Sequence, residues 1–138
     1  MPTLDIVSPE IILPQRRRIV VRITRWFANQ ETMAAHVVIR FHIAPPDSIF
    51  AAGVALDKNN RKSANITLLP SKSNIPFAMI TCCIATERDS EFRAGLAHEL
   101  QQALDIREPN FLYVRFEALD RKDVFYSVSG RLVNADKQ

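Results

Sequence analysis

The second residue of the sequence is a proline, and of all the residues in the chain it could carry the most unusual chemistry. The sequence begins Met1-Pro2-Thr3-Leu4, and a small second residue permits removal of an initiator methionine. Pro2 would then carry a free secondary amine, whose pKa of about 8 falls in an apolar pocket near cationic side chains. A neutral amine at physiological pH can act as a general base or a nucleophile. The alternative is structural: the proline merely starts a strand, where its missing N–H does little harm.

Basic and polar side chains at four other positions could bind an anion near such an amine. Arg40 shares the polar face of one predicted strand with His36, and Arg115 follows Tyr113 on the polar face of another. An arginine on a largely enclosed sheet surface needs an anionic partner or water, so Arg115 binds a ligand or pairs with an acidic residue of the chain. The formal net charge of +3 favours small anionic ligands over cationic ones.

The cysteines and histidines do not predict a metal site or a disulfide. Cys82 and Cys83 are adjacent, so on a strand they point to opposite faces and cannot bridge. We expect them to be core thiols in a reducing, cytoplasmic compartment. His36, His42 and His98 lack metal-motif spacing, and we expect neither a metal nor a cofactor. No signal peptide or membrane span is predicted.

Hydrophobic periodicity predicts the elements that position these residues. Strands are expected at 3–7, 35–43, 77–85 and 111–117 from alternating or continuously apolar patterns. Apolar residues at steps of three and four predict a helix over Gln15–Ala28, with five arginines on its other face. A second helix is expected from a capping box at Thr86 to Asp89 and to end near Leu104. We expect a turn or helical piece at 47–53, a short strand at 64–69, an edge strand at 124–128 and a frayed end at 134–138.

The order of these elements predicts a single α/β (α+β) domain over residues 1–138. Two βαβ units would form a four-stranded mixed sheet with both helices on one face. Residues 54–75 read as an exposed excursion, and residues 130–138 as a C-terminal tail. The uncovered sheet face would carry the mixed polar set that includes Arg40, Tyr113 and Arg115, facing either water or other subunits.

Three stretches resemble the tautomerase superfamily, which includes 4-oxalocrotonate tautomerase, macrophage migration inhibitory factor and cis-3-chloroacrylic acid dehalogenase. The first is Met1-Pro2 with its strand. The second is Phe41–Gly53, similar to the strand–proline–turn–glycine segment of longer members. The third, Ile84–Leu96 continued by Leu112–Phe116, is similar to the second βαβ unit of the dehalogenase-like branch.

The resemblance implies a cofactor-independent tautomerase that is a homotrimer, with sheets packed around a central axis and Pro2 at a subunit boundary. Pro2 would be the general base, acting on small 2-oxo or enol carboxylates. Arg88 would bind the carboxylate near the start of the second helix, unless it is a solvated charge, and backbone N–H groups add to anion affinity there. Tyr113 matches a pocket tyrosine of the inhibitory-factor-like proteins, and a packed aromatic is its alternative.

The sequence also departs from the dehalogenase-like pattern at three places. A second arginine of that pattern falls near Ala85, a water-activating glutamate falls near Tyr126, and a helix histidine is replaced in the Trp26-Phe27 region. We therefore expect simple tautomerisation rather than hydrolytic dehalogenation. Two alternatives stay open: a non-catalytic trimeric binding protein of the same fold, and a basic, ferredoxin-like nucleic-acid module. The strands lack an exposed aromatic stacking pattern, which makes nucleic acid the weaker partner.

Overall fold

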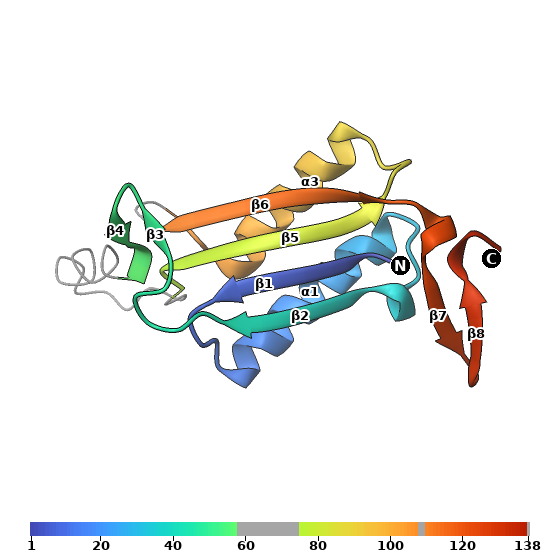
Figure 1. Cartoon of the computed structure of the whole chain (residues 1–138), viewed down its shortest axis with the longest axis horizontal. Helices are drawn as coiled ribbons and strands as arrows, with labels where there is room; N and C mark the ends of the chain where they lie inside the picture. The colour runs from blue at the N-terminus through green and yellow to red at the C-terminus, as the bar shows by residue number, and fades with distance from the viewer. Residues whose placement is uncertain (58–74, 108–109, 138) are drawn as a thin grey trace.

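The sheet has four strands in the order β2-β1-β5-β6 (Figure 1). The computed structural model describes residues 1–57, 75–107 and 110–137. Strand β1 (Thr3–Ser8) runs parallel to β2 (Val38–Ile43) and antiparallel to β5 (Phe77–Ala85), which runs parallel to β6 (Phe111–Leu119). The predicted mixed sheet built from two βαβ units is therefore confirmed.

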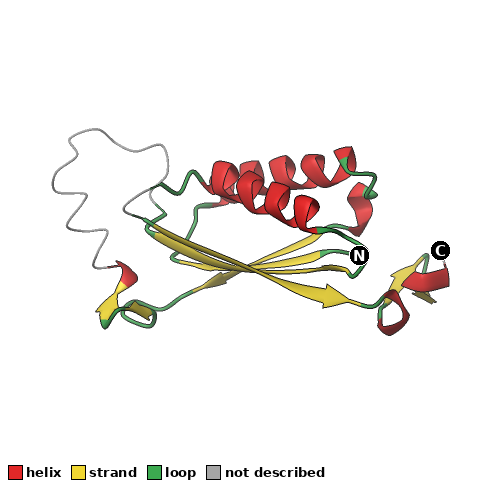
Figure 2. Ribbon diagram, turned by 90° about the horizontal axis from the view of Figure 1, so that it is seen from above, coloured by secondary structure: helices red, strands yellow, loops and turns green. Residues whose placement is uncertain are grey.

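Both long helices cover one face of this sheet and leave the other open (Figure 2). Helix α1 (Leu13–Asn29) has Pro14 at its start, where a missing N–H is tolerated. Helix α3 (Ser90–Leu104) ends at Asp105, which has a left-handed backbone conformation. Apolar residues of both helices and of the covered sheet face form the core, among them Leu4, Ile6, Ile19, Ile23, Phe27, Ile80, Cys82, Leu96 and Leu100.

The two cysteines have the environments that strand alternation predicts. Cys82 is buried on the helix side and Cys83 is partly exposed on the open side, and both are free thiols. Burial, with a smaller contribution from Cys83, raises the pKa of the Cys82 thiol to about 12, so this residue stays protonated at neutral pH. None of the helices that the structure describes is long and apolar enough to cross a membrane.

Three local predictions in the first half of the chain need correction or fall outside the described residues. Strand β2 begins at Val38, because His36 belongs to a short 3-10 turn, η1 (Ala34–His36). The turn or helical piece expected at 47–53 includes instead part of a hairpin of β3 (Phe50–Ala51) and β4 (Val54–Ala55). The strand expected at 64–69 lies outside the described residues.

The C-terminal segment also differs from the prediction. Strand β7 (Phe125–Val128) pairs with β8 (Arg131–Asn134) as a separate hairpin and does not extend the main sheet. Short 3-10 turns precede and follow this hairpin, η2 (Arg121–Asp123) and η3 (Ala135–Lys137). The end is held rather than frayed, since the Ala135 N–H donates to the Val124 carbonyl at 2.9 Å.

The start of α3 provides a stability test, because the residue that caps it is not the predicted one. The capping box places Thr86 at the N-cap, but the helix begins at Ser90 and the Asp89 carboxylate accepts from the Phe92 N–H at 2.8 Å. We expect Asp89→Ala to lower the free energy of unfolding by about 1 kcal/mol, as loss of an N-cap does. Thr86→Ala, a matched change at an exposed residue, should stay within about 0.5 kcal/mol in the same urea titration. Equal losses in the two variants would contradict this assignment.

Candidate active site

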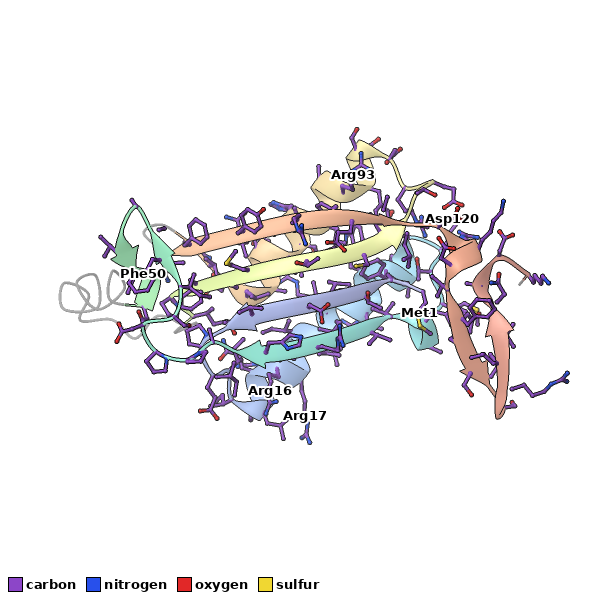
Figure 3. All side chains as sticks on the ribbon, in the orientation of Figure 1. Met1, Arg16, Arg17, Phe50, Arg93 and Asp120 are labelled. Carbon is purple, nitrogen blue, oxygen red and sulfur yellow. The ribbon has the colours of Figure 1, made fainter. Side chains whose placement is uncertain are left out.

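A cavity of about 340 Å³ lies at the end of the sheet where β1 begins, between the sheet, the ends of the helices and the C-terminal hairpin. Figure 3 shows Met1 at this end, next to η2 and the hairpin. Pro2 and Arg88, two of the residues predicted for the site, line it together. The other lining residues are Met1, Phe27, Glu31, Thr32, Met33, His36, Ile84, Ala85, Phe92, Arg121, Tyr126 and Ala135.

The sheet pairing explains why Pro2 and Arg88 meet. Strand β5 runs antiparallel to β1 with Thr3 opposite Cys83, so the end of β5 at Ala85 lies beside the start of β1. The tight turn after β5, in which the Arg88 N–H donates to the Ala85 carbonyl at 3.1 Å, then brings Arg88 to the cavity. On the other side, the Val38 N–H donates to the Pro2 carbonyl at 3.1 Å and fixes Pro2 against β2.

The Arg88 guanidinium is held in place by contacts from α3 and from the segment that follows α1. Its Nη2 donates to Thr32 Oγ1 at 2.9 Å, just beyond the end of α1. Its central carbon lies 4.5 Å from the centre of the Phe92 ring, which is a cation–π arrangement. Arg93 Nη1 donates to the Arg88 carbonyl at 2.8 Å and supports the backbone of the same turn. Because of these contacts, the partly buried guanidinium of Arg88 has a fixed position at the cavity wall.

The amino group at the chain start is in an environment that favours its neutral form. Burial in the cavity, and secondarily the positive charge of Arg121, lowers the pKa of the Met1 amino group below its usual value of 8.0. Arg121 comes from η2, after β6, and its Nε lies 3.8 Å from Glu87 Oε1. The sequence prediction missed Arg121 because it depends on the position of η2, which periodicity does not give.

His36 and Tyr126 meet across the cavity from two segments far apart in sequence. Their ring centres are 5.1 Å apart at an interplanar angle of 60°. His36, a candidate from the sequence, lines the cavity, although it lies in η1 rather than on a strand. Ala135, expected in a frayed end, also lines the cavity. The three places at which the sequence departs from the dehalogenase-like pattern also lie at this cavity, since Ala85, Tyr126 and Phe27 are all lining residues.

Arg40, Tyr113 and Arg115, the other three predicted binding residues, do not line this cavity within one chain. Arg40 makes a two-pronged ion pair with Asp5, Nε–Oδ1 at 2.6 Å and Nη2–Oδ2 at 3.0 Å. This contact, ahead of a weaker one from His42, lowers the pKa of the Asp5 carboxyl.

Arg115 donates to the Glu117 carboxylate, so of its two possible roles the intrachain ion pair is the one seen. Tyr113 is 43% exposed on the same open sheet face. Among the described residues no group of three or more His, Cys, Asp or Glu side chains is placed to hold a metal ion.

Comparisons with solved structures identify the fold, whereas the sequence matches no family model and no curated protein. Native fused 4-OT superposes on this chain with a TM-score of 0.64, and a protein inactivated by 2-oxo-3-pentynoate with a TM-score of 0.67. Each is 16% identical to this chain, and each alignment covers 98% of this chain and 97% of the other chain. A member of the cis-3-chloroacrylic acid dehalogenase family has a TM-score of 0.64 at 12% identity, covering 95% of this chain and 82% of its own. Fused 4-OT trimers and macrophage migration inhibitory factor of Toxoplasma gondii are also similar. The chain therefore has the fold of the tautomerase superfamily.

Proposed function

We propose that this chain is a cofactor-independent tautomerase that uses the amine of Pro2, after removal of Met1, as its general base. The observation that carries the proposal is the shared cavity. Pro2 and the ordered cation of Arg88 line the same 340 Å³ space, and in the same space burial and Arg121 lower the pKa of the neighbouring Met1 amino group. A neutral amine beside a fixed cation suits proton transfer on a carboxylate substrate. The free thiols of Cys82 and Cys83 suit a cytoplasmic protein.

The proposed reaction moves one proton between carbon and oxygen of a small 2-oxo carboxylate. The Pro2 nitrogen takes a proton from the carbon next to the keto group. The C–H electron pair becomes the C=C bond of the enol, and the carbonyl oxygen receives the proton. In the reverse direction the same amine returns the proton to carbon. Arg88 would bind the carboxylate, since a planar guanidinium forms paired hydrogen bonds with it. Phe27, Met33, Ile84 and Phe92 would contact an apolar substituent.

We propose a homotrimer for the assembly, supported by the open sheet face and by the fused 4-OT trimers of similar fold. Arg40, Tyr113 and Arg115 lie on that open face. In such a trimer they would contribute to substrate binding only across a subunit boundary. The alternative of a non-catalytic binding protein is favoured by one observation: Ala85 and Tyr126 stand in the cavity where the dehalogenase-like pattern has an arginine and a glutamate.

The test uses 2-oxo-3-pentynoate, the compound that inactivates one protein of the same fold. Its alkyne next to a ketone accepts a neutral amine by conjugate addition, which forms an N–C bond and moves one proton to carbon. We expect intact-mass analysis to show a chain beginning at Pro2 that gains the mass of one inhibitor, with peptide mapping placing it on Pro2. Retention of Met1 on nearly all molecules, or labelling elsewhere with Pro2 untouched, would contradict the mechanism and favour the binding protein.

The pH dependence of the reaction gives a second prediction. Because the neutral amine is the active form, kcat/KM for phenylenolpyruvate should rise with pH through the pKa of the Pro2 amine and then level off. In Arg121→Gln one positive charge is lost, so the ammonium form is less disfavoured and the rising limb should move to higher pH. We expect a partial shift, because burial is a larger cause than Arg121 of the lowered pKa of the neighbouring Met1 amino group. Arg131→Gln, in the β7–β8 hairpin, is the control, and an equal shift there would contradict the role of Arg121.

A further inference from the structure

The outer face of α1 carries a second candidate site, a groove of about 700 Å³. It is lined by four arginines, Arg17, Arg18, Arg22 and Arg25, together with Val21, Trp26, Asn29 and Glu99 from α3. The groove is separate from the Pro2 cavity: the two sets of lining residues have no member in common. Nothing in the proposed tautomerase reaction uses it.

The charge of this groove is mostly unbalanced. Arg22 Nε pairs with Glu99 Oε1 at 2.6 Å, but in the described part of the chain Arg17, Arg18 and Arg25 make no ion pair. Helix α1 contains no acidic residue at all. Contacts among the described residues leave this charge uncompensated, whereas an anionic partner would balance it.

The spacing of the arginines suits a helical occupant. Arg18, Arg22 and Arg25 are four and three residues apart, so they form a row along one face that spans about 10 Å of the helix. Val21 lies among them and is 54% exposed. An apolar side chain surrounded by arginines is typical of a protein interface, in which arginine is enriched and an apolar centre is desolvated. A helix lying in a groove presents side chains at just such intervals of three and four residues.

We propose that this groove docks an acidic amphipathic helix of a partner protein, with carboxylates on the arginine row and an apolar side chain on Val21. A nucleic acid fits less well. Its phosphates would use the arginines, but Trp26 is no free stacking platform, because its ring packs against Phe27 and Phe92 at centroid distances of 5.4 and 5.1 Å. A phosphate backbone also leaves Val21 without an apolar contact.

The groove remains accessible in the assembly proposed above. The helices lie on one side of the sheet and the open face on the other, so a trimer built on the open face leaves the outer face of α1 to solvent (Figure 2). Figure 3 shows Arg17, one of the lining residues, at the edge of the molecule near the start of α1. The docking proposal does not depend on the tautomerase activity and can fail independently of it.

The experiment measures binding of a fluorescent acidic peptide to the full chain by anisotropy. The probe is a helix of about fifteen residues with Glu at intervals of three and four and Leu between them. Variant Arg18→Gln/Arg22→Gln/Arg25→Gln removes the row, and Arg107→Gln/Arg131→Gln/Lys137→Gln removes the same charge elsewhere. Val21→Ser tests the apolar contact without changing charge. Thermal unfolding of each variant confirms that it folds, and hydrogen exchange of the wild type reads out protection of α1.

We expect the arginine-row variant to bind about tenfold or more weakly, Val21→Ser about threefold more weakly, and the control triple like wild type. Peptide binding should also protect amides of α1 from exchange. Equal weakening by the two triple variants, or no saturable binding, would overturn the proposal. So would tighter binding of single-stranded RNA or phosphatidylserine vesicles that Val21→Ser leaves unchanged, since the occupant would then be a polyanion without an apolar anchor. If the arginine-row variant does not fold, the peptide affinity of Val21→Ser and the protection of α1 amides from exchange test the proposal instead.

Discussion

A protein with one glycine placed before Pro2 is expected to lose about 10²- to 10⁴-fold in kcat/KM for phenylenolpyruvate, the contribution of a positioned general base. The extra residue converts the Pro2 nitrogen into an amide, which has no basic lone pair. It also moves the free amine by up to about 3.8 Å, one residue along the chain. We expect kcat rather than KM to change most, because Arg88, which would bind the carboxylate, is unchanged.

The comparison requires two proteins that differ only at this end. Both are released by a protease from the same leader, one beginning at Pro2 and one at Gly-Pro2, and both are checked by intact mass. Urea unfolding must be the same for the two, so that the difference reports chemistry. Equal turnover by the glycine-extended protein would remove Pro2 from the mechanism and leave the binding protein as the better explanation.

Replacement of Arg88 by Gln should raise KM for the same substrate by about 10- to 100-fold, with a smaller effect on kcat. The guanidinium is ordered by Thr32 Oγ1 and the Phe92 ring before substrate arrives, so binding a carboxylate costs it little further ordering. A charge-assisted pair of hydrogen bonds contributes about 1.5–3 kcal/mol, which is the basis of this range.

Arg88→Lys and Arg107→Gln are the controls for this prediction. Lysine keeps the charge but not the planar fork, so we expect an intermediate KM. Arg107 is exposed and pairs with Asp105 well away from the cavity lining, so its variant should behave like wild type. A KM for Arg88→Gln within twofold of wild type would show that the carboxylate binds elsewhere, with Arg121 as the next candidate.

The fold was predictable from sequence because its signals are local and strong. Strand β5 was predicted at its observed bounds, since a nine-residue run with eight apolar members, bounded by turn residues, has few other structures open to it. Helix α1 was found from its three-four periodicity. The predicted N-cap of α3 was wrong because Thr86 and Asp89 are both of residue types preferred at an N-cap, and only the tertiary path of the turn after β5 decides between them.

The candidate site was predictable only in part, since its residues come together through the pairing of distant segments. Pro2 and Arg88 could be named from their types and from the resemblance. Arg121 and Tyr126 reach the cavity because the C-terminal hairpin packs as a separate unit, which no periodicity indicates. Arg40 and Arg115 were correctly placed on the polar sheet face, but sequence cannot show that Asp5 and Glu117 lie there to pair with them.

The presence of Pro2 and Ala135 in one cavity has a consequence for the order of events during synthesis. The cavity cannot close until residue 135 has left the ribosome, and at 5–20 residues per second that takes on the order of ten seconds. Under the proposed mechanism, Met1 can therefore be removed before Ala135 joins the cavity that Pro2 lines. The removal of Met1 that this mechanism requires and the completion of the cavity would then be separate events, set apart by the distance between the two residues along the chain.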